Sequence, residues 1–184
     1  MAKVIRKRAD EAKVLILLEK YKSKNKSYAD IIEEYKKFLR EELLKTTEKI
    51  CPFCGAFADY SFSIEHFKPK GDKRYIQLQL EWENLYPCLR NVNTSTKFDE
   101  NNPPFDPVEI NYPDKIELNS KMDSYVPKNS DDKQAIETIR KYSLEKNEDL
   151  IAGISNYYSW RSEGKFKKGE KYPFYEYIEP LFQY

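Results

Sequence analysis

The sequence is poor in cysteine, glycine and histidine, and each shortage limits what the chain can be. Its 184 residues include three cysteines, five glycines and a single histidine, His66. So few cysteines, in an odd number, argue against a secreted disulfide scaffold. No stretch approaches the roughly 18 apolar residues of a membrane span, and the first residues lack the apolar segment and cleavage site of a signal peptide. We therefore expect a soluble, cytoplasmic protein without a membrane partner.

Excess charge of one sign is also lacking, because the formal net charge is +1. No overall basic field therefore indicates a nucleic-acid partner. Basic residues do cluster at 3–8, 20–26 and 165–168, and such runs are ordinarily solvated helix faces or tails. Aromatic residues, by contrast, are abundant. Fifteen tyrosines and ten phenylalanines predict a well-filled core, a stacking surface, or both.

Periodicity predicts an α+β protein in which helices flank a short β region. Apolar residues recur at helical spacing in four segments, namely 8–22, a stretch opened by the capping-box sequence at 27–30, 131–142 and 147–161. Residues 58–64 alternate polar with apolar side chains, as a half-buried strand does. The polar stretch 99–104 is expected to be a loop. The candidate chemistry lies between the flanking helices, from Cys51 to Lys97.

Cys51 and Cys54 form a Cys-x-x-Cys motif on a turn followed by glycine. Two thiolates at this spacing can hold one tetrahedral zinc ion, and Cys88 is a candidate third ligand. The alternatives are a redox pair, which no surrounding βαβ pattern supports, and unrelated buried cysteines. A four-cysteine site is impossible with three cysteines.

Glu65 and His66 form the second element, in the sequence Ser-Ile-Glu-His-Phe-Lys-Pro-Lys. A neutral imidazole accepts a proton near pH 7, and a carboxylate can hold a hard divalent cation. Together they supply a base for water and a metal for phosphate charge, which phosphodiester hydrolysis requires. On a regular strand, however, the two side chains point to opposite faces. They reach one site only if the strand kinks or ends near Glu65.

The third element is Trp82-Glu83-Asn84-Leu85, followed by Asn93 and Lys97. Each asparagine alone is as readily a turn or helix-cap residue. The order Cys-x-x-Cys, Glu-His, Trp-x-Asn-Leu and a later Asn nevertheless resembles the HNH endonucleases of the ββα-metal class. The Glu-His-Phe-Lys-Pro-Lys sequence is most similar to that of the PtuB-like HNH proteins of retron and Septu antiphage systems. The resemblance extends over roughly residues 40–160.

The resemblance implies a ββα-metal HNH core at residues 49–107, between an N-terminal helical segment (1–48) and a C-terminal helical region (108–184). It implies that His66 is the general base and that Glu65 and Asn93 bind Mg²⁺ or Mn²⁺. Asn84 would hold the loop that orients His66. It further implies a nucleic-acid substrate, DNA in preference to RNA, and a PtuA-like ATPase as partner, with a retron reverse transcriptase and its msDNA as further candidates.

Charge and proximity, apart from the family pattern, suggest Lys68, Lys70 and Lys97 as phosphate contacts. The family's second Cys-x-x-Cys is incomplete in this chain, because Cys88 stands one place early and Val92 replaces the last cysteine. Apolar packing or a weaker site is therefore expected in place of a four-cysteine zinc knuckle. Two other functions stay open: a ββα module that binds nucleic acid or a partner without catalysis, and a zinc-dependent interaction protein.

Overall fold

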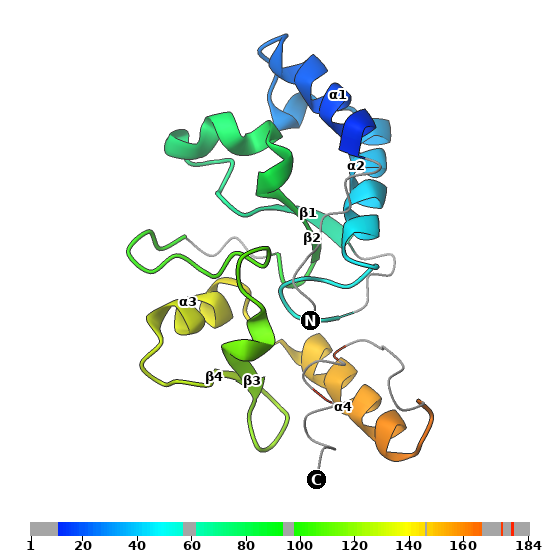
Figure 1. Ribbon diagram of the computed structural model, residues 1–184, viewed down its shortest axis with the longest axis vertical. Coiled ribbons are helices and arrows are strands. Elements are labelled where there is room, and N and C mark those ends of the chain that lie inside the picture. Colours follow the sequence, from blue (N-terminus) through cyan, green and yellow to red (C-terminus); the bar gives the residue numbers. More distant parts are fainter. Residues whose placement is uncertain are drawn as a thin grey trace.

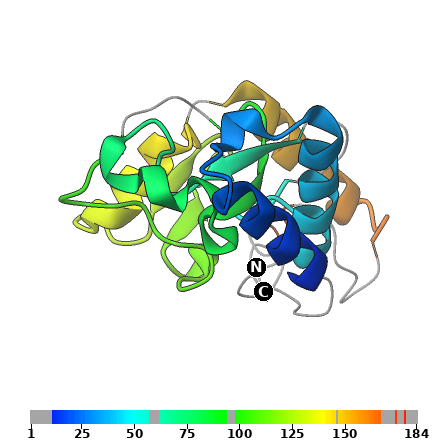
Figure 2. The same ribbon diagram turned by 90° about the horizontal axis from the view of Figure 1, so that it is seen from above.

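The computed structural model describes residues 11–56, 62–93, 98–145, 147–166, 174 and 178. Figure 1 shows three levels along the long axis of the molecule. The N-terminal helices lie at one end, a two-stranded sheet lies in the middle, and a second small sheet with two helices lies at the other end. Figure 2 shows the same molecule from above, with α1 and α2 side by side. No helix among the described residues is long and apolar enough to cross a membrane.

The N-terminal segment consists of α1 (Glu11–Lys22), the short 3-10 helix η2 (Tyr28–Asp30) and α2 (Glu33–Thr46). The predicted capping box forms, since the Asp30 carboxylate accepts hydrogen bonds from Ser27 N (2.6 Å) and Ser27 Oγ (2.8 Å). The capping box opens the short helix η2. The prediction that it opens the long second helix was wrong. The backbone is extended at the two residues that follow η2, so α2 begins only at Glu33.

The central sheet pairs β1 (Phe62–His66) with β2 (Leu85–Leu89) in antiparallel register. Glu65 lies opposite Tyr86, and His66 lies opposite Leu85. The connection contains the 3-10 helices η3 (Lys73–Leu80) and η4 (Trp82–Asn84). The predicted strand is confirmed for its second half, while residues 57–61 lie outside the described residues.

The C-terminal part contains α3 (Lys133–Lys141) and α4 (Glu148–Ser162), close to the predicted helices. Both start at a side-chain cap, because Asp132 Oδ1 accepts from Ala135 N (3.0 Å) and Asn147 Oδ1 from Leu150 N (3.2 Å). The region is not only helical, however. The 3-10 helix η5 (Tyr112–Asp114) precedes a second antiparallel sheet of β3 (Ile116–Leu118) and β4 (Tyr125–Pro127). Strands of three residues are too short to show a period in the sequence.

These elements confirm the α+β class but not the finer ββα-metal arrangement. The two antiparallel strands are present, whereas the described residues between β2 and α3 contain no α-helix. Residues 94–97, directly after Asn93, lie outside the described part. The helix that would complete a ββα-metal core after β2 therefore stays a prediction.

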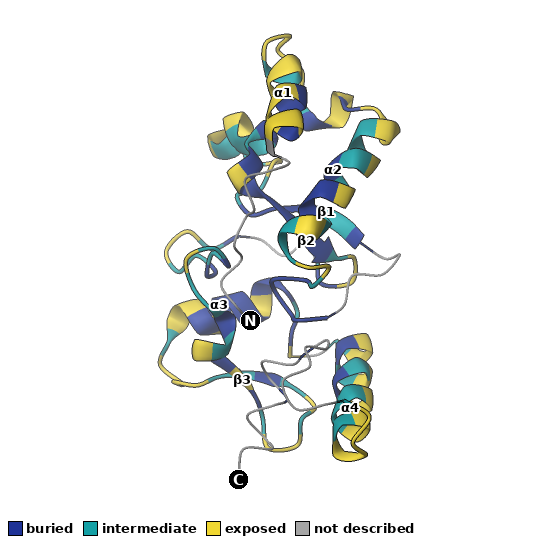
Figure 3. Ribbon diagram, turned by 45° about the vertical axis from the view of Figure 1, so that its right-hand side comes forward, coloured by how far each residue is buried: buried dark blue, intermediate teal, exposed yellow. Residues whose placement is uncertain are grey.

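Two clusters of buried side chains form the core, one on each side of the central sheet (Figure 3). One lies between the N-terminal helices and the sheet and includes Leu39 and Leu85. The other runs from Cys51 to Ile178 and contains Phe53 stacked on Tyr142, with ring centroids 4.1 Å apart. The predicted segments 49–107 and 108–184 thus share one hydrophobic core.

Candidate functional site

His66 is the last residue of β1 and is buried, with 5% of its surface exposed. Its Nε2 atom lies 3.1 Å from the backbone carbonyl oxygen of Gln79, in η3. A carbonyl oxygen can only accept a hydrogen bond, so Nε2 carries the proton and donates it. In the neutral imidazole this leaves the lone pair on Nδ1, which is the form that can accept a proton from water.

The surroundings of His66 keep the imidazole neutral. Burial, together with the nearby charge of Lys70, lowers the pKa of His66 from 6.5 to about 4, and the hydrogen bond to Gln79 only partly opposes this shift. The Tyr28 ring of η2 packs edge-on against the imidazole, with centroids 4.6 Å apart. At pH 7 His66 is therefore an uncharged base in a closed environment.

This depressed pKa makes the stability of the fold depend on pH. The unfolded chain binds a proton at His66 below pH 6.5, whereas the folded chain does so only near pH 4. Stability should therefore fall as the pH drops through this window, by about 3 kcal/mol at pH 4. Urea unfolding of the wild type and of His66→Gln at pH 7 and pH 4 measures the effect as the difference between the two proteins. Equal losses in both proteins would contradict it.

The comparison with His66→Gln is needed because Glu65 contributes with the opposite sign. Burial raises the pKa of Glu65 above 4.5, although Lys141 lowers it in part. The folded chain therefore takes up this proton before the unfolded chain does, which favours folding as the pH falls through the window above 4.5. The contribution of Glu65 is common to both proteins and cancels in the difference.

Asn84, the last residue of η4, fixes the loop that follows His66. Its Oδ1 atom accepts a hydrogen bond from Lys68 N (2.6 Å), and its Nδ2 donates to the carbonyl oxygens of Lys68 and Leu78, both at 3.0 Å. Its backbone oxygen also accepts from Phe67 N (3.0 Å). The side chain thus joins the end of β1 to η3, the element whose Gln79 holds the imidazole. Asn84 thus holds this loop, while the role in orienting a catalytic base that the resemblance implies for it stays a prediction.

Glu65 does not meet His66, because β1 stays regular to its end and the two side chains leave opposite faces. Glu65 is 5% exposed, and its Oε1 lies 3.3 Å from Nζ of Lys141, which belongs to α3 and is 4% exposed. The contact is an ion pair without hydrogen-bond alignment, since Oε1 accepts no hydrogen bond. The kink that would aim both groups at one site is absent, so the structure shows Glu65 as part of a buried ion pair.

Asn93 is half-buried in the turn after β2. Its Nδ2 donates to Ser63 Oγ (2.9 Å) and to the carbonyl oxygen of Ile64 (3.2 Å), so it holds the edge of β1. Asn93 therefore contacts β1, the strand that carries Glu65. Within the described ranges, no group of three or more His, Cys, Asp or Glu side chains is placed to hold a metal ion.

The three cysteines are free and fully buried, and they lie together. Burial by itself raises the pKa of the Cys51 thiol, but hydrogen bonds from the Cys54 and Cys88 thiols and from the N–H groups of Leu89 and Phe53 outweigh burial and place that pKa well below its ordinary value. Burial and the neighbouring Cys51 raise the pKa of Cys54 and of Cys88. Of the three thiols, Cys51 is therefore the one that loses its proton most readily.

The turn that carries Cys51 and Cys54 is held by its own backbone. Gly55, with φ of 76°, closes the turn, and its N–H donates to the Cys51 carbonyl oxygen at 2.9 Å. As placed, the thiols do not form a complete metal site, in agreement with the absence of such a group from the described residues. Structural zinc at Cys51, Cys54 and Cys88 stays a prediction.

The three predicted phosphate-binding lysines differ in their surroundings. Nζ of Lys68 lies among three aromatic rings, 4.6 Å from the centroid of Phe98 and 5.4 and 5.6 Å from those of Phe67 and Tyr75. Lys70 is exposed, and its charge acts on His66. Lys97 lies outside the described residues. Lys70 is thus the lysine that the structure brings to the imidazole.

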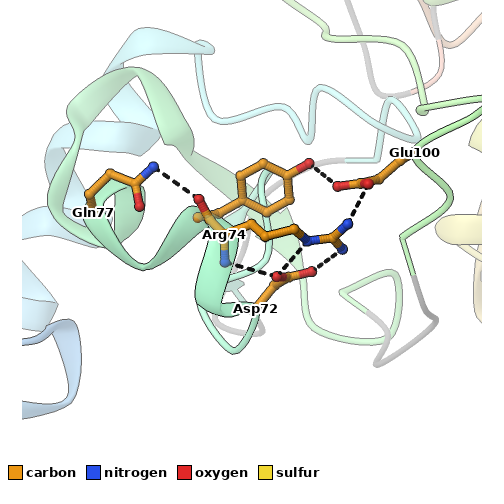
Figure 4. Close-up of polar contacts among 5 residues, drawn as sticks. Asp72, Arg74, Gln77 and Glu100 are labelled. Atoms are coloured by element: carbon orange, nitrogen blue, oxygen red, sulfur yellow. Dashed lines mark hydrogen bonds and ion pairs between the residues drawn. The ribbon is translucent and has the colours of Figure 1, made fainter.

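A surface network holds the aromatic surroundings of Lys68 in place (Figure 4). The Arg74 guanidinium pairs with Asp72, through Nε to Oδ1 at 2.9 Å, and with Glu100. Tyr75 donates its hydroxyl hydrogen to the same Glu100. These contacts tie η3 to the segment that begins at Phe98. The effect on stability is expected to be small because the network is exposed.

Sequence reasoning did not identify Gln79, Tyr28 or Lys141 as part of the site. The backbone of Gln79 and the side chains of the other two make the decisive contacts, and none belongs to the motif. No family model matches this chain, and neither a curated protein nor a solved structure does.

Proposed function

We propose that this protein is a metal-dependent HNH endonuclease that hydrolyses phosphodiester bonds, with DNA as its substrate. One observation carries the proposal. The single histidine is held as a neutral base at the end of β1, by the Gln79 carbonyl oxygen at 3.1 Å, beside a loop that Asn84 fixes on both sides. The order of these residues is the order that resembles the HNH family.

In this mechanism, His66 takes a proton from the attacking water at Nδ1, while Nε2–H stays bonded to Gln79. Lys70 lies near enough to His66 to act on its charge, and in the proposal it contacts a phosphate oxygen. Asn84 is a positioning residue that holds the end of β1 and the following loop against η3. Mg²⁺ or Mn²⁺ would neutralise charge on the phosphate and the leaving group.

Glu65 and Asn93 are the proposed ligands of this ion, but their present arrangement does not fit one. Glu65 is occupied by the Lys141 ammonium at 3.3 Å. Asn93 donates to β1 only through its amide nitrogen, and Oδ1 is the atom that would bind a metal ion. A metal ion would bind Glu65 only after Lys141 withdraws, so the proposal requires a rearrangement of β1 and α3.

The proposal includes a defence role of the retron or Septu type in the cytoplasm, with a PtuA-like ATPase as partner and a retron reverse transcriptase with its msDNA as a further candidate. The near-neutral net charge of +1 suits a nuclease that a larger assembly positions on its substrate, because free scanning of DNA relies on a basic surface. RNA is the alternative substrate.

The second candidate function is a binding module of the same fold without catalysis. The Glu65–Lys141 pair favours it, because a buried ammonium neutralises the carboxylate that the catalytic metal needs. The two functions differ in whether cleavage occurs at all.

A cleavage assay on plasmid DNA, single-stranded DNA and RNA distinguishes them. The chain is tested with Mg²⁺, Mn²⁺ or EDTA, both alone and co-expressed with an ATPase encoded beside it. The nuclease predicts cleavage that requires the metal and disappears with EDTA. An absence of cleavage with every substrate, even in the assembly, would favour the binding module.

A further inference from the structure

The outer side of His66 is closed by the N-terminal helical segment. Tyr28 of η2 packs its ring edge-on against the imidazole at 4.6 Å, and Tyr28 itself is 8% exposed. On the other side Nε2 is bonded to Gln79. The imidazole keeps only 5% of its surface exposed. A base in this state cannot receive a proton from a water that attacks a bulky phosphodiester.

Tyr28 is held in place by the same element that holds His66. Its backbone N–H donates to the Gln79 side-chain Oε1 at 3.0 Å, while the Gln79 backbone oxygen accepts from the imidazole. A second tie lies close by, where Lys22 at the end of α1 pairs with Glu81 at 2.8 Å. The N-terminal segment is therefore fastened to η3 and the following residue by two polar bonds, and by an apolar cluster that contains Tyr28 and Leu80.

Two lysine side chains lie near the Tyr28 ring. Nζ of Lys70 lies 4.7 Å from the ring centroid, and Nζ of Lys36 lies 5.9 Å away. Lys36 in turn pairs with Glu33 at 3.0 Å, and Arg40 lies 4.0 Å from the same carboxylate. Cation–π contacts of this kind contribute about 0.5–1 kcal/mol each at exposed sites. They favour the closed position of Tyr28, and they occupy Lys70, the lysine nearest to His66.

We propose that Tyr28 is a gate: the N-terminal segment of α1, η2 and α2 holds the His66 site closed in the free chain, and the site becomes accessible only when Tyr28 moves away from η3. The benefit of such a gate, which is control of cleavage, rests on the proposed nuclease function. The closed contact itself is independent of that function. Movement of Tyr28 frees the imidazole and Lys70 together, since both contact the same ring.

The single histidine allows the gate to be tested without any cleavage. Diethyl pyrocarbonate acylates accessible neutral imidazoles, and tandem mass spectrometry that locates the added group on the His66 ring, apart from nearby Lys68 and Tyr60, reports its reaction. Tyr28→Ala should react at least about tenfold faster than the wild type. Tyr28→Phe is the matched control, because it keeps the ring and should stay protected.

Gln79→Ala provides a second variant in case Tyr28→Ala does not fold. It removes the Oε1 acceptor of the Tyr28 N–H but keeps the backbone carbonyl that bonds His66, and it should also increase the acylation rate. Circular dichroism and thermal unfolding establish that each variant is folded. A folded Tyr28→Ala or Gln79→Ala in which His66 is as protected as in the wild type would overturn the gate.

The cleavage assay separates the gate from the nuclease proposal. If Tyr28→Ala exposes His66 and no variant ever cleaves nucleic acid, the gate stands and the nuclease proposal fails. If the wild-type chain alone cleaves as fast as Tyr28→Ala, the gate fails and the nuclease proposal stands. The gate together with the nuclease predicts that Tyr28→Ala cleaves faster than Tyr28→Phe in the absence of a partner.

Discussion

Replacing Lys141 by methionine is expected to lower the free energy of unfolding by about 3–5 kcal/mol, because it leaves a carboxylate in the core without its counter-ion. Lys141 and Glu65 are 4% and 5% exposed, and their charged atoms lie 3.3 Å apart. Methionine retains most of the volume of the lysine stem, so the loss reports the charge and not a cavity. Urea unfolding at pH 7 provides the measurement.

Lys165→Met is the control for this variant. Lys165 and Glu163 form a shorter ion pair, at 2.8 Å, but both side chains are about half exposed. An exposed pair of this kind typically contributes less than about 1 kcal/mol. Burial, and not distance, should therefore decide which lysine matters. Similar losses in the two variants would contradict the role of the buried pair.

The double variant Glu65→Gln, Lys141→Met should recover most of the lost stability, since a neutral pair of similar volume replaces the ion pair. If it is as unstable as Lys141→Met alone, then Lys141 contributes through other contacts, among them the nearby Tyr142 ring, whose centroid lies 5.7 Å from Nζ.

Replacing His66 by alanine should reduce metal-dependent cleavage by about 10²–10⁴-fold, the range that a positioned general base contributes. The expected loss is in the chemical step, because His66 is not a predicted phosphate contact. Lys70→Ala serves as the comparison and should weaken nucleic-acid binding, with a reduced dependence of binding on salt. The cleavage rate of His66→Ala and the nucleic-acid affinity of Lys70→Ala are measured in the assembly that supports wild-type cleavage, with the same metal ion. A His66→Ala protein that is folded and cleaves normally would exclude this residue as the base.

Local signals in the sequence were sufficient for the helices of the fold. Apolar spacing alone located α3 and α4 closely, because burial of one face is a property of neighbouring residues; the structure adds the caps Asp132 and Asn147 at their starts. The capping box at Ser27 formed as expected but opened a single 3-10 turn. Two β-branched residues in extended conformation follow that turn, and the sequence contained no simple signal for this interruption.

The sequence also placed the members of the site in the right order, but it could not describe their directions. Alternation along a strand did predict that Glu65 and His66 point apart, and the structure confirms this regular geometry. The motif alone suggested the opposite, a convergence on one metal. The partner of the Glu65 carboxylate lies on a helix some 70 residues away in the chain. That partner, Lys141, belongs to no local motif.

The cover over His66 could not be foreseen for the same reason. Tyr28 and Gln79 are far from His66 in sequence and have no chemistry of their own that marks them as part of a site. Their role follows from tertiary packing, in which η2 lies against η3. A residue that acts through its backbone carbonyl, as Gln79 does, leaves no trace in its side-chain type.

Chemical rescue tests most directly whether His66 is the base of a nuclease. His66→Gly is assayed under single-turnover conditions with the metal ion that supports wild-type cleavage, with and without added imidazole. The account predicts that the glycine variant is nearly inactive and that imidazole restores part of the rate, since the added base takes the place of the missing ring. Cleavage by His66→Gly at the wild-type rate, unaffected by imidazole, would contradict it.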